Sequence, residues 1–149
     1  SSGTSFQQAW SGCSSLTSFP LIDTSSGTNF YRTWHACSNL TSFPLIDTSS
    51  GTNFQQAWIA CTSLADFPAN MFDTTGTLVS TTFYKAFLQC ALTAQSIENI
   101  LVSLDTNGQS GVELDISGGT NAGKSAWTVA AVAAFDSLEL KGWSITYNE

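Results

Sequence analysis

Charged side chains are scarce in this sequence, and basic ones are the scarcest. Only 10% of the 149 residues are charged, and Lys plus Arg number 4 against 11 Asp plus Glu. An average soluble protein has about 25% charged residues. So few cations cannot neutralise the phosphates of a nucleic acid or form a basic patch for an anionic membrane. We therefore expect no nucleic-acid partner.

Long apolar runs and catalytic side chains are also lacking. The apolar stretch at residues 126–135 falls short of the roughly 18 residues that a spanning helix needs, so we expect no membrane insertion. His35 is the only histidine, and no serine stands in a glycine-flanked turn that would present it as a nucleophile. Asp23 and Asp47 are equivalent positions of a repeat, so their proximity is no sign of a carboxylate pair. We predict no enzyme activity, no cofactor and no metal.

The sequence is instead organised by a repeat. LTSFPLIDTSSGTNF occurs at residues 16–30 and again at residues 40–54, which sets a period of 24 residues. Such a period is typical of stacked coils. We predict an α/β fold, namely a leucine-rich-repeat solenoid with coils of about 24 residues, each with a short parallel strand and a short helix. Residues 1–90 would form the coils, the first incomplete and the last with an insertion, and residues 91–149 a C-terminal cap.

The helix of each coil is inferred from aromatic spacing. Phe6, Trp10 and Cys13 stand at i, i+4 and i+7, which is one face of an α-helix, so we expect these side chains to point inward. The cysteines lie 24, 24 and 29 residues apart, which fits no zinc motif and favours a ladder of buried thiols. A buried Trp should find a partner for its N–H. The equivalent residues are Phe30, Trp34 and Cys37, then Phe54, Trp58 and Cys61, then Phe83, Phe87 and Cys90.

The strand of each coil is inferred from the spacing of Leu16, Phe19 and Leu21. Alternation would put Phe19 and Leu21 inward and would turn Ser18, Pro20 and Ile22 outward. Because proline lacks a backbone N–H, we expect strands of only about three residues here.

The chain after Cys90 is predicted to run helix, strand, helix, strand. The first helix starts at Thr93 or Ser96 and continues through Leu104, and DTNG at residues 105–108 is a turn signal. Residues 112–116 alternate as a strand, residues 125–140 form the second helix, and residues 143–147 the last strand. Calcium binding near Asp105 stays open, although the spacing does not fit an EF-hand loop.

Residues 118–125, GGTNAGKS, match the phosphate-binding pattern G-x-x-x-x-G-K-[ST]. That pattern belongs to a larger nucleotide-binding sheet with a second acidic motif on a later strand. Only about one helix and one strand can follow here, so we interpret the segment as an ordinary strand-to-helix connection.

Residues 11–18, SGCSSLTS, together with the T-N-aromatic start of each coil, resemble the BspA-like leucine-rich repeats of bacterial surface proteins. The resemblance covers residues 1 to about 90 and departs from the family at FPLID, where relatives have an unbroken L-x-L run. The C-terminal part is similar to the ends of repeat proteins of phage tails and virions. Both resemblances imply an extracellular location, on a virion appendage or a cell surface, and neither supplies catalytic residues.

Two surfaces are candidates for binding. One is the row of strand residues that are expected to face outward. The other is the outer surface of the helix in the second coil, where the residues differ from those of the other coils. The expected function is a non-catalytic recognition or adhesion module that binds a host surface protein or glycan. The alternative is a structural segment of a fibre or filament that assembles through coil stacking. The candidate residues are Ser18, Pro20, Ile22, Ser42, Pro44 and Ile46 on the strand row, and Tyr31, Arg32 and His35 on the helix exterior.

The first coil is expected to carry a partner of its own. SSGTSF at residues 1–6 matches SSGTNF at residues 25–30 and 49–54, so the sequence enters the repeat part-way through a coil. The open end of a coil exposes core side chains. We therefore expect an upstream domain or another chain to pack on it.

Overall fold

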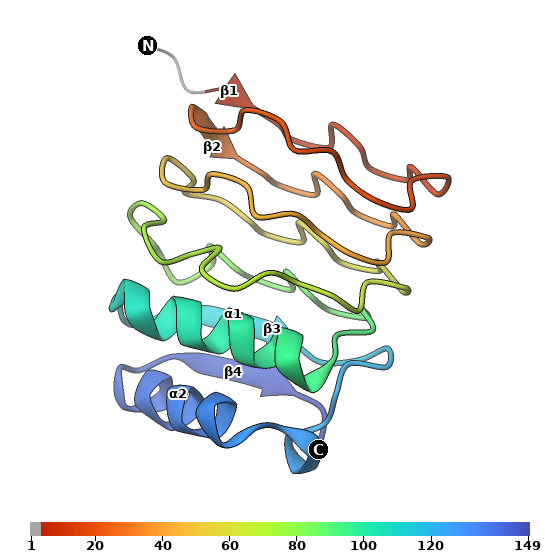
Figure 1. The fold of residues 1–149 in the computed structure, drawn as a ribbon. Helices are drawn as coiled ribbons and strands as arrows, with labels where there is room; N and C mark the ends of the chain where they lie inside the picture. The colour runs from red at the N-terminus through yellow and green to blue at the C-terminus, as the bar shows by residue number, and fades with distance from the viewer. Residues whose placement is uncertain (1–3) are drawn as a thin grey trace.

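The computed structural model describes residues 4–149, so the first three residues of the SSGTSF match lie outside the described part. Figure 1 shows chain segments stacked one below another, with the two α-helices in the C-terminal part. β1 pairs with β2 and β3 with β4, each as a parallel two-stranded sheet. The elements are β1 (Thr4–Ser5), β2 (Gly27–Asn29), α1 (Ala94–Asn107), β3 (Glu113–Ile116), a 3-10 helix η1 (Lys124–Ala126), α2 (Val129–Leu140) and β4 (Ser144–Tyr147).

The predicted leucine-rich-repeat solenoid is wrong. Within residues 4–149 the structure has two α-helices and two small parallel sheets, and no α-helix precedes Ala94. The segments that were expected to be helical form turns. The segments that were expected to be strands of one sheet are joined only by single bridges such as Ser18 to Ser42.

The chain forms two consecutive turns where each early helix was predicted. In the second of these segments, Thr33 N donates to Phe30 O at 3.3 Å and Cys37 N to Trp34 O at 3.2 Å. The third residue of each turn has a positive φ, 52° at Arg32 and 57° at Ala36, as type II turns require and an α-helix does not allow. We call residues 6–13, 30–37, 54–61 and 83–90 the turn segments. Their other left-handed residues are Gln8, Gly12, Gln56, Ala60, Lys85 and Gln89.

The remaining N–H groups of a turn segment bond to the next segment. Arg32 N donates to Gln55 O at 3.1 Å, and Trp34 N donates to Ala57 O at 2.9 Å. Local and intersegment bonds therefore alternate along the chain, which satisfies the backbone without a helix.

Aromatic rings stack through the interior from segment to segment. The ring centroids of Trp10 and Trp34 are 6.1 Å apart, those of Trp34 and Trp58 5.1 Å, and those of Trp58 and Phe87 4.9 Å, all nearly parallel. The inward direction of the aromatic stripe was thus predicted correctly, although its helical conformation was not. The indole N–H groups of Trp34 and Trp58 have no hydrogen-bond partner, contrary to expectation.

The expected alternation at FPLID also fails. Phe19 is buried as predicted, but Leu21 is 75% exposed and Ile46 only 4% exposed. Because Pro20 interrupts backbone pairing, the segment does not keep the two-residue period of a strand. The leucine therefore turns outward, and the isoleucine returns to the core.

The C-terminal elements agree with the sequence more closely. Thr93 caps α1 by accepting a bond from Ser96 N at 3.2 Å, and Gly108 ends this helix with φ 82°. DTNG is therefore mostly the last turn of α1 and not a separate turn. α2 begins at Val129 under a Thr128 cap, later than expected, because a 3-10 turn at η1 precedes it. β3 and β4 pair in register along their whole length.

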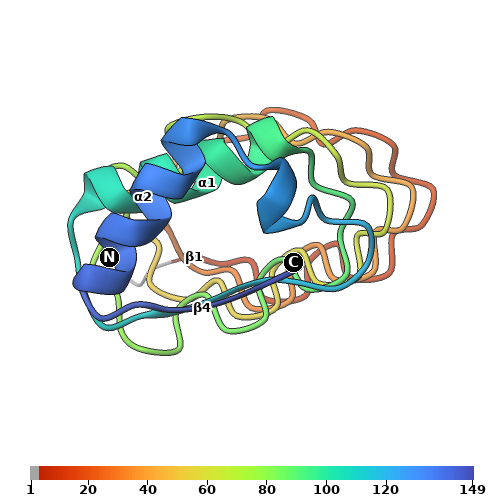
Figure 2. The same ribbon diagram turned by 90° about the horizontal axis from the view of Figure 1, so that it is seen from below.

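Two faces result, as Figure 2 shows: α1 and α2 lie on one side, with β4 opposite. We call the side formed by the four turn segments with β3 and β4 the turn face. No helix among residues 4–149 is long and apolar enough to cross a membrane.

Candidate functional site

The turn face continues without interruption from the turn segments into the C-terminal sheet. Phe83 forms a parallel bridge with Leu114, and Gln89 N donates to Ser117 O at 2.9 Å. The backbone under this surface is therefore fixed by hydrogen bonds from one segment to the next.

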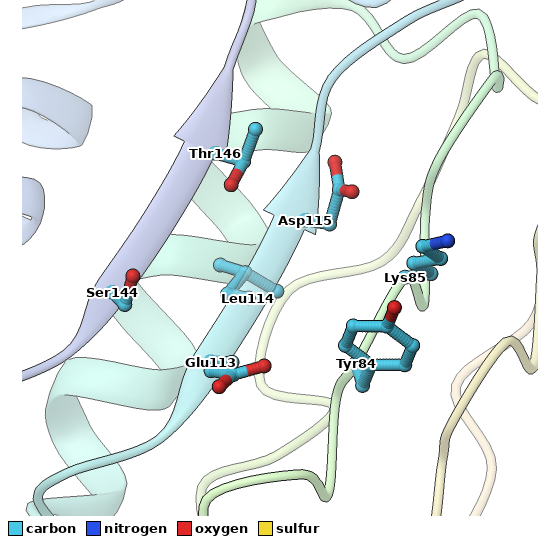
Figure 3. Close-up of a pocket in the computed structure, with 7 residues that line it drawn as sticks. All are labelled: Tyr84, Lys85, Glu113, Leu114, Asp115, Ser144 and Thr146. Carbon is cyan, nitrogen blue, oxygen red and sulfur yellow. The ribbon is translucent and has the colours of Figure 1, made fainter.

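A small hollow lies on the turn face where the fourth turn segment meets β3 and β4 (Figure 3). Glu113 and Asp115 are two apart on β3 and point to the same side. The strand register places Ser144 and Thr146 of β4 beside them. The lining residues are Tyr84, Lys85, Glu113, Leu114, Asp115, Ser144 and Thr146.

The side chains of the hollow offer many hydrogen-bonding groups and one aromatic ring. Tyr84 is 38% exposed, and Lys85 Nζ lies 5.2 Å from the centre of its ring. Asp115 Oδ1 accepts bonds from Ser117 N at 2.9 Å and Ser117 Oγ at 2.7 Å, which fixes that carboxylate. Glu113 is exposed and has no such partner among the described residues. This set suits a ligand with several hydroxyl or amide groups.

The structure brings the predicted residues Tyr31, Arg32 and His35 together on the turn face, about half-buried. Arg32 Nε donates to Gln56 Oε1 at 2.5 Å, and the guanidinium carbon lies 5.5 Å from the centre of the Tyr31 ring. His35 Nδ1 is 3.0 Å from Ser11 Oγ. Burial, with a smaller effect of the Arg32 charge, lowers the pKa of His35. The outward side of this segment was thus identified, although it is not helical.

The predicted strand row does not form one surface. Ser18 and Pro20 are exposed, and Ser42 and Pro44 are half-buried. The two isoleucines of the row contact the core instead: Ile22 packs against it, and Ile46 is part of it. The outward positions belong to Leu21, which the sequence pattern placed inward, and to its repeat equivalent Leu45.

The segment with the phosphate-binding pattern is confirmed as a strand-to-helix connection between β3 and α2. Five of its eight backbone N–H groups bond inside the protein, so these five are not free to bind a phosphate. Lys124 Nζ lies 3.8 Å from the centre of the Phe135 ring, a cation–π contact that holds it against the core. The bonds from the loop run from Gly118 N to Asn148 Oδ1, Thr120 N to Cys90 O, Ala122 N to Leu92 O and Lys124 N to Asn148 O.

Asn121 holds this loop, and sequence reasoning missed it. The side chain is 4% exposed and makes four hydrogen bonds. The only signal in the sequence is an Asn in a Gly-rich loop, and this signal indicates an ordinary turn equally well. The bonds run from Leu92 N to Oδ1 at 2.8 Å, and from Nδ2 to Phe87 O, Ile116 O and Ser117 O at 3.0, 3.1 and 3.2 Å.

Asp105, which raised the question of calcium, joins the two helices. Its Oδ1 accepts bonds at 2.6 Å from both Lys141 Nζ and Ser137 Oγ. Burial raises the pKa of Asp105, but the bonds from Lys141 and Ser137 outweigh it, so this pKa lies below the usual value. Among residues 4–149, no three His, Cys, Asp or Glu side chains gather as a metal site.

The cysteines form the predicted thiol ladder. All four are free, and each buried thiol donates to the Trp carbonyl of the preceding turn segment. Burial raises the pKa of Cys61 to about 12. Cys13, at the start of the ladder, is exposed. The three bonds are Cys37 Sγ to Trp10 O at 3.1 Å, Cys61 Sγ to Trp34 O at 3.0 Å and Cys90 Sγ to Trp58 O at 3.1 Å.

Comparisons with known protein families, with curated proteins and with solved structures find no match.

Proposed function

We propose that the protein is a non-catalytic recognition module that binds a glycan or a host surface protein through the turn face. The hollow around Glu113 carries this proposal. It combines an exposed aromatic ring with carboxylate, hydroxyl and ammonium groups on a backbone fixed from both sides. Aromatic rings stack on sugars, and carboxylate and hydroxyl oxygens accept hydrogen bonds from sugar hydroxyls. Because the backbone under the hollow is already fixed, less conformational entropy is lost on binding.

The chemistry of the hollow favours recognition over catalysis. Glu113 and Asp115 neighbour each other on one strand and are not placed on opposite sides of a cleft, as glycoside hydrolysis requires. His35 bonds to Ser11 and lies in another turn segment. We also propose an extracellular setting for such a module, on a cell surface or a phage appendage.

A glycan array probed with fluorescently labelled protein tests the proposal. We expect a defined set of glycans, or intact host cells, to bind the protein. Tyr84→Ala and Glu113→Gln should each weaken that binding at least tenfold. Glu139→Gln, which changes an exposed acid on α2 away from the turn face, is the matched control and should bind like the parent. Absence of binding to glycans and host cells, or equal binding by all variants, would contradict the proposal.

A further inference from the structure

The first turn segment presents carbonyl groups in the arrangement that accepts bonds elsewhere in the molecule. In the second segment, Tyr31 O, Thr33 O and His35 O accept N–H groups of the segment before it. The equivalent carbonyls of the first segment receive no bond from the described residues. These are the carbonyls of Gln7, Ala9 and Ser11.

The opposite end of the molecule presents the matching donors. Ser144 N donates to Val112 O at 3.0 Å, so Ser144 directs its N–H and C=O toward β3. Because these directions alternate along a strand, Ile145 and Tyr147 direct theirs away from β3. No described strand lies on that side of β4, and Figure 1 shows β4 below β3 at the lower end of the stack. An edge of this kind is a template for pairing with another chain.

Both ends also leave apolar side chains partly uncovered. Ile145 and Tyr147 of β4 pack against the core but are only half-buried. At the other end, Phe6 and Trp10 are only partly buried, since they are the first rings of the stack.

We infer that the end formed by β4 and α2 stacks on the first turn segment of a second copy of this chain, head to tail. The outward N–H groups of β4 would then donate to the free carbonyls of the first turn segment. Within the chain, likewise, a turn segment donates N–H groups to carbonyls of the segment that follows it in the sequence. Two first turn segments facing each other would instead bring carbonyls against carbonyls. A head-to-tail contact uses different surfaces on the two copies, so it repeats and gives open chains. The inference does not depend on the proposed recognition function.

Sedimentation velocity of the reduced protein over a range of concentrations tests the contact. We expect the average mass to rise with concentration, from the 15.8 kDa of one chain to more than the mass of a dimer. Ile145→Pro should abolish this rise at the β4 end, because proline has no N–H to donate along the outward edge of the strand. Attaching a bulky maleimide to Cys13 should abolish it at the other end, because Cys13 is the exposed thiol of the ladder. Val102→Lys, on the outer side of α1, is the control and should associate like the parent.

Mixing the two blocked proteins distinguishes head-to-tail contact from other arrangements. The Ile145→Pro protein keeps a free first turn segment, and the Cys13-modified protein keeps a free β4 end. The mixture should therefore form dimers and nothing longer. A parent protein that stays monomeric at millimolar concentration, or a mixture that stays monomeric, would overturn the inference. Association that survives modification of Cys13 would also overturn it, because two β4 ends would then be in contact.

Discussion

Residues 4–93 satisfy their backbone groups with turns and with bonds to the next segment, whereas residues 94–149 use two α-helices and a pair of parallel strands. Both parts nevertheless stack their segments and direct their apolar side chains into one core. The spacing of those side chains is similar in the two parts, because two consecutive four-residue turns place side chains inward at about the period of a helix. Inward spacing alone therefore does not distinguish the two structures.

Local residues decide between them. α1 starts at a Thr93 cap, and its only left-handed residue is Gly108 at its end. The second turn segment instead holds Arg32 and Ala36 in the left-handed region, where the first segment has Gly12 at the position of Ala36. What stabilises the turns is the hydrogen bond to the neighbouring segment, which a helix would not make.

The ring stack of the turn segments gives the largest expected effect. Trp58→Ala should lower the free energy of unfolding by about 3–5 kcal/mol, as deletion of a buried ring does. Trp58→Phe should cost only about 1 kcal/mol, because it also removes an indole N–H that has no partner. Phe87 already occupies the equivalent position one segment later. Urea denaturation measures both values, and equal losses for the two variants would contradict the packing described.

The loop that joins β3 to α2 depends on Asn121. Asn121→Ala should cost about 2–4 kcal/mol, because it leaves buried backbone groups of the loop and the fourth turn segment without partners. The exposed Asn39 also bonds to a neighbouring segment, through Nδ2 to Ser14 O at 2.6 Å, and is the control. Asn39→Ala should cost less than about 1 kcal/mol, since water replaces its bond. Similar losses for both would mean that the Asn121 bonds contribute little.

The left-handed residues of the turn segments can be tested with two alanines of one segment. Ala60→Gly should raise the stability by up to about 1 kcal/mol, because Ala60 has φ 60° and glycine adopts this conformation without strain. Ala57→Gly, at a buried position without positive φ, should lower the stability by about 1 kcal/mol. Thermal unfolding of both variants gives the comparison. If Ala60→Gly destabilised as much as Ala57→Gly, the segment would be helical there.

The smallest expected effect is a pH dependence at His35. Its pKa is lowered in the folded protein, so the unfolded chain binds a proton first as the pH falls through about 6.5. The contribution of His35 to stability is therefore present above that pH and is lost below it. His35→Ser, which copies the equivalent Ser11, should flatten the change in stability between pH 7.5 and pH 5.5. An unchanged pH profile would show that His35 titrates normally.

The sequence predicted the core more accurately than the fold. It identified Phe30, Trp34 and Cys37 as inward, because spacing and hydrophobicity record burial. It placed α1, β3 and β4 within a few residues, because caps and alternation are local signals. It missed the turns, because nothing local marks Arg32 as left-handed and the intersegment bonds that hold it are nonlocal. The isoleucines of FPLID were misplaced because Pro20 ends the strand period.

The candidate site could be addressed from the sequence only in part, for the same reason. Tyr31, Arg32 and His35 were singled out because they differ between repeated segments, and their role in binding stays a prediction. The hollow at Glu113 and Tyr84 joins segments about 30 residues apart that share no repeat. Only the pairing of the fourth turn segment with β3, and of β3 with β4, places those side chains together.

Detection of hydrogen bonds by NMR, through the scalar coupling between a backbone nitrogen and the accepting carbonyl carbon, tests the turn segments most directly. We expect couplings from Trp34 N to the Ala57 carbonyl carbon and from Cys37 N to that of Trp34. Couplings from Trp34 N to the Phe30 carbonyl carbon and from Cys37 N to that of Thr33 would instead show an α-helix at residues 30–37. That result would contradict the stacked turn segments on which the turn face and its candidate site depend.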